Sequence, residues 1–292
     1  MNRFKKVVIH GGVFHADDVA VVALLQSAGY TLPVERKFKV SEEELADPAI
    51  LVADIGGNHN PALNNFDHHQ DKNMQAACVL FYDSFVLEDT GNELEGNREV
   101  FEKFKKDFLE PISDADCGRG NGGDLSFSKV VVLFNPGPEA SEETRMAAFD
   151  EAVAFMLKAM EKSMARCKEI VESKRAVLDA DTAVNGKVLV LDKFVPWDEH
   201  VYSRPDQEDL LYVIFPSLRG GFCIQQVPVE AGSFEGRKPL PEEWAGKRGD
   251  DLKELVGLDE SGSATFCHPG RFICGAETLE DALKLAELAV KS

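Results

Sequence analysis

The chain has 292 residues, of which 44% are hydrophobic and 28% charged, an ordinary composition for a soluble globular protein that is long enough for two cores. Its formal net charge of −19 argues against broad capture of nucleic acid, because such binding needs cationic groups that replace the counterions of many phosphates. Its apolar runs fall far below the ~20 residues of a membrane helix, its first residues do not resemble a secretory signal or transit peptide, and its six cysteines form no Cys-x-x-Cys pair. We therefore expect a cytoplasmic protein with reduced thiols and no structural zinc site.

The first part of the chain predicts alternating strands and helices. Strands are expected at 5–10, 34–39 and 49–53. Between them lie a helix over 17–29, with Asp17 or Asp18 as its N-cap, and a short helix that opens with a capping box. This alternation implies a mainly parallel sheet, in which ligand sites lie beyond the carboxyl ends of the strands. His10 and Asp54 both fall at such ends.

The later part of the chain predicts longer helices and then a second set of strands. Helices are expected at 74–88, 98–109 and 141–180. The helix at 98–109 would end before Pro111. The last helix lacks Gly and Pro and carries a methionine-rich apolar stripe, for which core packing is favoured over binding of a partner helix. The remaining elements are strands at 187–194, 210–215, 222–227, 264–267 and 271–274 and a helix capped by Thr278.

We therefore predict an α/β protein in three parts. The first is an N-terminal domain with a mainly parallel sheet (1–140), which carries the candidate catalytic residues. A long helical connection (141–183) leads to a smaller α+β C-terminal domain (184–292), for which we expect a role in substrate binding.

Histidine and aspartate residues cluster in three packets, His10–Asp18, Asp54–Gly57 and Phe66–Gln70, which hold four of the seven histidines. A mixed imidazole and carboxylate donor set suits Mn, Co or Zn better than Mg or Ca, which prefer all-oxygen shells. The alternative is a group of solvated loop residues with one or two helix caps, and a helix cap explains Asp18 at least as well as catalysis does. The position of the packets at strand ends, beside glycine pairs that allow close backbone approach, favours a metal site.

These packets resemble the first three motifs of the DHH phosphoesterase superfamily and, in detail, those of the Myg exonuclease family. The matching stretches are His10-Gly-Gly-Val-Phe-His-Ala-Asp-Asp18, Asp54-Ile-Gly-Gly57 and Phe66-Asp-His-His-Gln70. Two further stretches, 234–246 and 266–275, resemble the closing signatures of that family, so the likeness covers nearly the whole chain. It implies a DHH-like N-terminal domain and metal-dependent hydrolysis of phosphodiesters.

The resemblance also divides the candidate ligands between two divalent metal ions, with manganese preferred and Mg, Co or Zn as alternatives. One ion would be bound by His10, His15 and Asp54. The other would be bound by Asp17, Asp54, His68 and an aspartate of the fourth motif. For that last ligand we favour Asp116 over Asp114, although Cys-Gly follows it where the family usually has Asn-Gly. Compared with the pyrophosphatases of the superfamily, His15 replaces an aspartate and one residue is inserted after His10, which leaves the ligand geometry open.

The expected chemistry is in-line attack on phosphorus by a hydroxide held between two ions. Because neighbouring side chains on an extended backbone diverge, one of His68 and His69 would bind metal and the other would face substrate. The resemblance implies that His69 meets the phosphoryl or leaving-group oxygens and that Asp67 orients a ligating imidazole. The predicted activity is 3′→5′ exonuclease action on RNA. The alternatives are a small-molecule phosphohydrolase, acting on pyrophosphate or short oligonucleotides, and a non-catalytic metal-binding scaffold.

In the C-terminal half, a few cationic side chains are placed by motif to meet substrate phosphates. They are Arg237, Lys238, His268 and Arg271. The alternative is that they are solvated loop charges. Trp244 and Phe272 could stack on a base, although core packing is favoured for both, and Trp197 is open between the two roles. The expected partner is single-stranded RNA or a short oligonucleotide, with no membrane, and a homodimer is one option for the oligomeric state.

Overall fold

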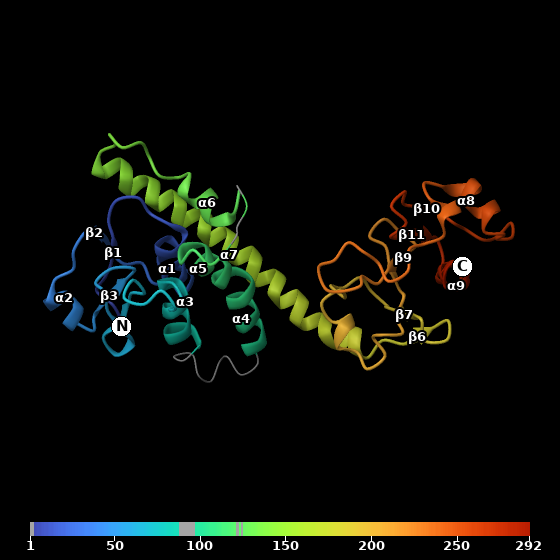
Figure 1. The fold of residues 1–292 in the computed structure, drawn as a ribbon, viewed down its shortest axis with the longest axis horizontal. Coiled ribbons are helices and arrows are strands. Elements are labelled where there is room, and N and C mark those ends of the chain that lie inside the picture. The colour runs from blue at the N-terminus through green and yellow to red at the C-terminus, as the bar shows by residue number, and fades with distance from the viewer. Residues whose placement is uncertain (1–2, 88–96, 121–122, 124) are drawn as a thin grey trace. The chain divides into compact units, whose positions relative to one another are not determined.

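The computed structural model describes residues 3–87, 97–120, 123 and 125–292, and the chain divides into two compact units, Met1–Lys168 and Glu169–Ser292 (Figure 1). The units divide inside the long helix α7 (Glu142–Leu178), whereas the predicted domain boundary at 183–184 lies just beyond the end of that helix. Each unit has its own sheet. Within the described residues, no helix is long and apolar enough to cross a membrane.

The first unit is built on a five-stranded sheet with the order β2-β1-β3-β5-β4. Its strands are β1 (Lys6–His10), β2 (Val34–Lys37), β3 (Ile50–Ala53), β4 (His59–Asn60) and β5 (Asn65–Phe66). All neighbours pair in parallel except β4, which pairs antiparallel with β5. The predicted mainly parallel sheet is confirmed, and its central strands β1 and β3 are the apolar runs that burial on both faces requires. β4 and β5 carry no sequence signal, because two residues are too few to show an alternation.

Short helices surround this sheet. They are α1 (Ala16–Ser27), α2 (Glu42–Ala46), α3 (Ala77–Tyr82), α4 (Arg98–Phe104), α5 (Glu110–Asp116), α6 (Phe127–Val132) and a 3-10 turn, Pro61–Leu63. α1 is buried from Ala16 to Leu25, which makes it the central helix of the unit. The predicted capping box of α2 is confirmed, with reciprocal bonds between Ser41 and Glu44. The helix predicted at 74–88 is α3 followed by the π-helical turn Asp83–Leu87, and its last residue lies outside the described residues.

Two predicted helix boundaries are wrong. α1 begins after His15 as N-cap, and Asp18 instead occupies the third helical position, from which its carboxylate accepts the backbone N–H of His15. The second helix does not end before Pro111. A π-helical turn, Lys105–Leu109, leads from α4 into α5, and Pro111 lies directly after this turn, at the second residue of α5. Asp116 therefore lies at the end of a helix.

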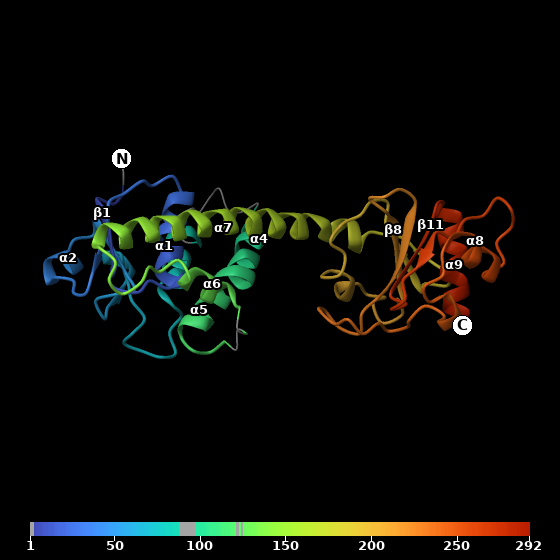
Figure 2. The same ribbon diagram turned by 90° about the horizontal axis from the view of Figure 1, so that it is seen from above.

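α7 is one continuous helix that belongs to both units (Figure 2). Its buried apolar residues include Phe149, Val153, Met156 and Met160 in the first unit and Ile170 and Val177 in the second. Met156 and Met160 are core residues, which confirms the interpretation of the methionine-rich stripe as a packing face.

The second unit contains a six-stranded sheet with the order β10-β11-β9-β8-β7-β6, antiparallel except for the pair β7 and β8. Its strands are β6 (Thr182–Ala183), β7 (Val188–Val190), β8 (Tyr212–Pro216), β9 (Phe222–Gln226), β10 (Phe266–Cys267) and β11 (Ile273–Ala276). Its helices are α8 (Gly249–Leu255) and α9 (Leu279–Lys291), with 3-10 turns at Val201–Ser203 and Glu242–Trp244. The predicted α+β architecture is confirmed.

Alternate residues of β8 supply the two cores of this unit. Tyr212 packs in the cluster that contains α8, α9 and Trp244. Val213 packs in the cluster that contains the end of α7 and Trp197. Both tryptophans are thus core residues. Phe272 is exposed and its ring contacts the imidazole of His268, so the core packing favoured for it is wrong.

Candidate metal centre

The predicted packets meet at the carboxyl edge of the first sheet. His10 is the last residue of β1, Asp54 follows β3, and the Asp67–His69 segment follows β5. Because these three strands run in parallel, their carboxyl ends lie at the same edge. Helices α1 and α5 add side chains to this edge, namely Asp17, Asp18 and Asp116, and His15 precedes α1.

Asp54 connects the two sides of the site. Its Oδ2 lies 3.2 Å from Nε2 of His10, and its Oδ1 lies 3.2 Å from Nε2 of His68. The same nitrogen of His68 is 3.2 Å from Oδ2 of Asp116, whose other oxygen is 3.5 Å from Nδ1 of His15. Asp54 thus brings its two carboxylate oxygens to two different imidazoles.

The backbone at Asp54 has φ +57°, in the left-handed region, and glycines with positive φ follow at Gly56 and Gly57. A residue other than glycine rarely adopts this conformation, and aspartate tolerates it better than most because its short side chain is polar. The turn directs the carboxylate of Asp54, which is 2% exposed, into the site.

His69 differs from His68 in exposure more than in direction. The two rings lie 4.5 Å apart, and Nδ1 of His69 is 3.8 Å from the same oxygen of Asp54 that His68 contacts. The predicted divergence of the two rings is therefore wrong, because the backbone is not extended but enters a turn at His69. The side chain of His69 is 61% exposed and that of His68 is 9% exposed. Nδ1 of His69 lies 2.7 Å from Oδ1 of Asp67, which also accepts the backbone N–H of His69, while Oδ2 of Asp67 accepts the N–H of Gly57.

Asp17 is fully buried, and both of its oxygens are engaged by helix α3. Oδ2 accepts the N–H of Ala77 at 3.0 Å, and Oδ1 accepts the N–H of Cys78 at 2.7 Å. The carboxylate therefore satisfies amides at the start of α3 that have no intrahelical partner. Burial and the charges of Asp54 and Asp116 raise the pKa of Asp17 to about 8.

Asp18 is also fully buried, but only one of its oxygens is satisfied. Oδ1 accepts the backbone N–H groups of His15 and Val19 at 2.9 and 2.8 Å. Among the described residues, Oδ2 has no hydrogen-bond donor, and it lies 3.3 Å from Nε2 of His10. Burial raises the pKa of Asp18 to about 7 despite the neighbouring imidazole of His10.

The charges of the site are strongly coupled. Burial opposes protonation of His10 and His68, but contacts with carboxylates outweigh it and raise their pKa values to about 9 and about 11. Burial likewise opposes ionisation of Asp54 and Asp116, but the imidazoles beside them lower the pKa of both carboxyls. The carboxylates of the site thus attract protons to its imidazoles. A divalent cation would neutralise the same negative charge.

The donor atoms fit a metal ion in position as well as in chemistry. In the part of the chain that the structure describes, three groups of side chains bring one donor atom each within 4.8 Å of one another. They are His10 with Asp18 and Asp54, Asp54 with His68 and His69, and His68 with Asp116 and Cys117. Nitrogen and oxygen donors in this mixture suit a borderline divalent ion, so the residues could hold one or more such ions.

Residues that support the site were not predicted. Nη2 of Arg36 donates to the carbonyl of Gly12 at 2.8 Å, and the guanidinium lies over the ring of Phe14. The side chain of Asn135 pairs with both the N–H and the carbonyl of Phe14 at 2.9 Å. Together they fix the loop between His10 and His15. No local pattern could have found them, since Asn135 lies 121 residues from its partner.

Arg119 and Cys117 support the other side of the site. Arg119 donates to the carbonyl of Met74, to the side chain of Gln75 and to Asp114, which places Asp114 in an ion pair on the surface. Sγ of Cys117 lies 3.6 Å from Nδ1 of His68. Asp116, and not Asp114, therefore contacts the imidazoles.

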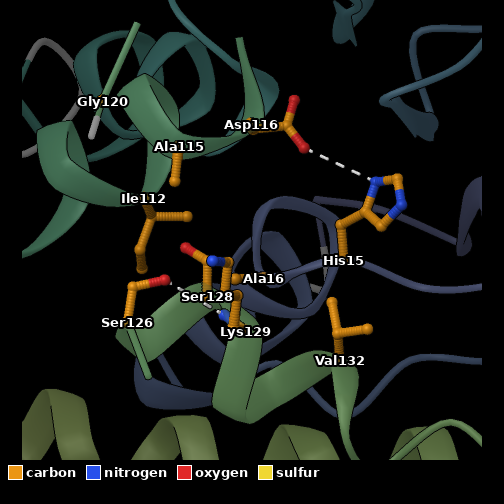
Figure 3. A pocket seen from close by; sticks show the side chains of 10 residues that line it. All are labelled: His15, Ala16, Ile112, Ala115, Asp116, Gly120, Ser126, Ser128, Lys129 and Val132. Atoms are coloured by element: carbon orange, nitrogen blue, oxygen red, sulfur yellow. Dashed lines mark hydrogen bonds and ion pairs between the residues drawn. The ribbon is translucent and has the colours of Figure 1, made fainter. Parts of the chain in front are cut away.

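A cavity of about 320 Å³ opens beside His15 and Asp116 (Figure 3). Its opposite wall comes from α6 and the residue before it, with Ser126, Ser128 and Lys129 among the lining residues. This volume is at the lower end for small-molecule sites. The cavity thus combines candidate metal ligands with hydroxyl and ammonium groups.

The four cationic residues predicted to meet substrate belong to the second unit and are engaged there. Arg237 donates to the backbone carbonyls of Gln207 and Leu210, and Lys238 donates to the carbonyl of Val290 at 2.8 Å. Nδ1 of His268 accepts the N–H of Gly270, and Nη1 of Arg271 donates to the carbonyl of Leu240.

The fold and the site define an α/β protein with a candidate His/Asp metal centre at the carboxyl edge of a mainly parallel sheet. The model of the MYG1 exonuclease family, described as an uncharacterised protein family (UPF0160), matches residues 6–290. The chain belongs to this family, as the resemblance of its motifs predicted.

Full-length relatives support this assignment. A MYG1 protein of Dictyostelium discoideum is 27% identical over 96% of this chain and 94% of its own length. The MYG1 exonuclease of Rattus norvegicus is 27% identical over 96% of this chain and 83% of its own length. A MYG1 protein of Chlamydia muridarum is 28% identical over 96% of both chains. No solved structure matches the chain significantly.

Proposed function

We propose that the protein hydrolyses phosphodiester bonds with the help of divalent metal ions, and that it acts as a 3′→5′ exonuclease on single-stranded RNA or short oligonucleotides. The observation that carries the proposal is the carboxylate of Asp54, which His10 and His68 share at the carboxyl edge of the sheet. The name exonuclease borne by the rat relative supports the reaction class.

The proposal assigns the metal ligands as predicted from the sequence, with manganese as the metal. One ion would be held by His10, His15 and Asp54. The other would be held by Asp17, Asp54, His68 and Asp116. Such ions lower the pKa of a water molecule and neutralise charge on phosphoryl oxygens. Asp17 would need a small shift of its carboxylate, because both of its oxygens accept amide N–H groups of α3.

In this proposal the protein side chains orient the substrate and move its protons. The contact of Nδ1 of His69 with Asp67 leaves Nε2 as the ring nitrogen that can meet a phosphoryl or leaving-group oxygen. The cavity beside His15 would accept the neighbouring sugar or phosphate, with Ser128 and Lys129 as hydrogen-bond donors. Substrate contacts by Arg237, Lys238, His268 and Arg271 stay a prediction.

The test is incubation of the pure protein with Mn²⁺ and end-labelled single-stranded RNA, single-stranded DNA or pyrophosphate. We expect RNA to shorten progressively from its 3′ end, faster than DNA. Asp54→Asn should lower the rate by more than about a hundredfold, because it removes the charge that two imidazoles share. Asp150→Asn, on the exposed face of α7, is the matched control and should leave the rate unchanged.

The other outcomes identify the alternatives. Hydrolysis of pyrophosphate alone would replace the exonuclease by a small-molecule phosphohydrolase. Bound Mn²⁺ without cleavage of any of the three would leave a metal-binding scaffold and overturn the proposal. Action in the cytoplasm and a homodimeric state are part of the proposal, and cell fractionation and analytical ultracentrifugation test them.

A further inference from the structure

The free carboxylate oxygen of Asp18 is the feature of the site that the proposed ligand set does not use. Asp18 has no exposed surface, and its Oδ2 has no hydrogen-bond donor among the described residues. Burying a carboxylate oxygen without a hydrogen bond is costly, and native proteins seldom leave one in this state. The oxygen points toward Nε2 of His10, 3.3 Å away.

Asp17 and Asp18 are neighbours on α1, but they differ in how many of their carboxylate oxygens accept hydrogen bonds. Asp17 gives both oxygens to the backbone amides of α3. Asp18 gives one oxygen to the amides of His15 and Val19, whereas the other accepts no hydrogen bond from the described residues and lies 3.3 Å from Nε2 of His10. Of the two carboxylates, that of Asp18 is therefore the one with an oxygen that no backbone amide engages.

The surroundings of this oxygen are those of a cation site. Nε2 of His10 lies 3.2 Å from Oδ2 of Asp54 and 3.3 Å from Oδ2 of Asp18, and a single ring nitrogen cannot donate one proton to both oxygens. The three donor atoms of these residues lie within 4.8 Å of one another. Two carboxylate oxygens and one imidazole nitrogen form a suitable face for a borderline divalent ion.

We infer that Asp18 is a metal ligand, and that its Oδ2 binds the same divalent cation as His10 and Asp54. The inference rests on the proposed metal centre and changes its composition, because it adds a carboxylate to the ion that His10 and His15 were predicted to hold. Asp18 then has two roles. Oδ1 fixes the backbone of His15 at the start of α1, and Oδ2 contributes negative charge to the ion.

The test measures Mn²⁺ binding by equilibrium dialysis and by electron paramagnetic resonance, without substrate. Asp18→Asn keeps an oxygen that can accept the N–H of His15 and replaces the oxygen that faces His10. We expect the variant to lose one bound Mn²⁺ per chain, or to bind it at least about tenfold more weakly. Asp150→Asn is the matched control and should bind as the unmutated protein does. Asp18→Ser, which also retains an acceptor for His15, replaces Asp18→Asn if circular dichroism shows that the amide variant does not fold.

Unchanged stoichiometry and affinity in a folded Asp18 variant would overturn the inference but leave the proposed function intact. Absence of Mn²⁺ binding by the unmutated protein would overturn both. A crystal structure of the unmutated protein with Mn²⁺ decides the point without any variant. Oδ2 of Asp18 within about 2.2 Å of the ion supports the inference, and an ion bound without Asp18 contradicts it.

Discussion

His68 and His69 are adjacent residues of one type whose surroundings differ. Both rings face Asp54, yet burial separates a ring that can only contact its neighbours from a ring that solvent or substrate can reach. The different roles predicted for the two stay a prediction, and it is exposure and not opposite direction that distinguishes the two rings.

The imidazole of His69 provides the first prediction at this scale. His69→Gln should lower kcat by about 10²–10⁴-fold, as expected for loss of a group that transfers a proton or meets the developing charge. Binding of Mn²⁺ should change little, because His68 and Asp116 remain. Steady-state kinetics and a Mn²⁺ titration check this, with His59→Gln on β4 as the matched control. Loss of Mn²⁺ in parallel with activity would instead make His69 a metal ligand.

The candidate ligands could be found from the sequence because residue type and position at strand ends both marked them. Arg36, Asn135 and Arg119 could not be found in this way. Each acts through backbone carbonyls or amides of segments that only the folded chain brings near, and a hydrogen bond to a backbone group demands no particular residue in the partner. The free oxygen of Asp18 was also hidden, because a helix cap accounted for the residue.

At the scale of elements, the site depends on how α5 is held against the segment that follows β5. The sequence wrongly predicted that a helix ends before Pro111. A proline predicts a helix end from its own geometry, but it gives no sign of the π-helical turn that precedes α5. The strands β1, β2 and β3 were predicted within two residues at each end, and burial gives β1 and β3 a strong apolar pattern.

Arg119 provides the prediction for this scale. It connects the end of α5 to Met74 and Gln75, so Arg119→Ala should destabilise the protein by about 1–2 kcal/mol through the loss of several hydrogen bonds at a partly exposed site. It should also weaken Mn²⁺ binding, because Asp116 lies three residues earlier. Thermal unfolding and a Mn²⁺ titration measure the two effects. Arg175→Ala, which removes an exposed i,i+4 ion pair in α7, is the control and should change neither by much.

At the scale of the whole molecule, the metal-free protein should be less stable as the pH rises. The pKa values of His10 and His68 are raised from 6.5 to about 9 and about 11, so the stability that these residues contribute is present below 6.5 and is lost as the pH rises through those values. The pKa values of Asp17 and Asp18 are raised from 3.8 to about 8 and about 7, so ionising them also costs stability as the pH rises.

Metal binding should show the opposite dependence. Because the ligands bind an ion only when deprotonated, the affinity for Mn²⁺ should rise with pH and binding should release protons. The difference in Tm between Mn²⁺ and EDTA should therefore be larger near about pH 8 than near about pH 6. Scanning calorimetry at the two pH values, with calorimetry in two buffers to count released protons, measures this. If the difference in Tm became smaller toward high pH, the ligands would not lose protons on binding Mn²⁺, and the prediction would be wrong.

The left-handed backbone at Asp54 restricts this position more than its ligand chemistry does. Glutamate has the same charge but a poor tolerance for positive φ, whereas asparagine has the tolerance without the charge. Both Asp54→Glu and Asp54→Asn should thus lose metal binding. Asp54→Asn also loses the ion pairs with His10 and His68, so its loss of stability should depend on pH, whereas the backbone strain in Asp54→Glu should not. Unfolding at two pH values and Mn²⁺ titrations distinguish the two variants. Aspartate is the one acidic residue that satisfies both demands, so chain geometry and electric charge converge on a single choice of amino acid.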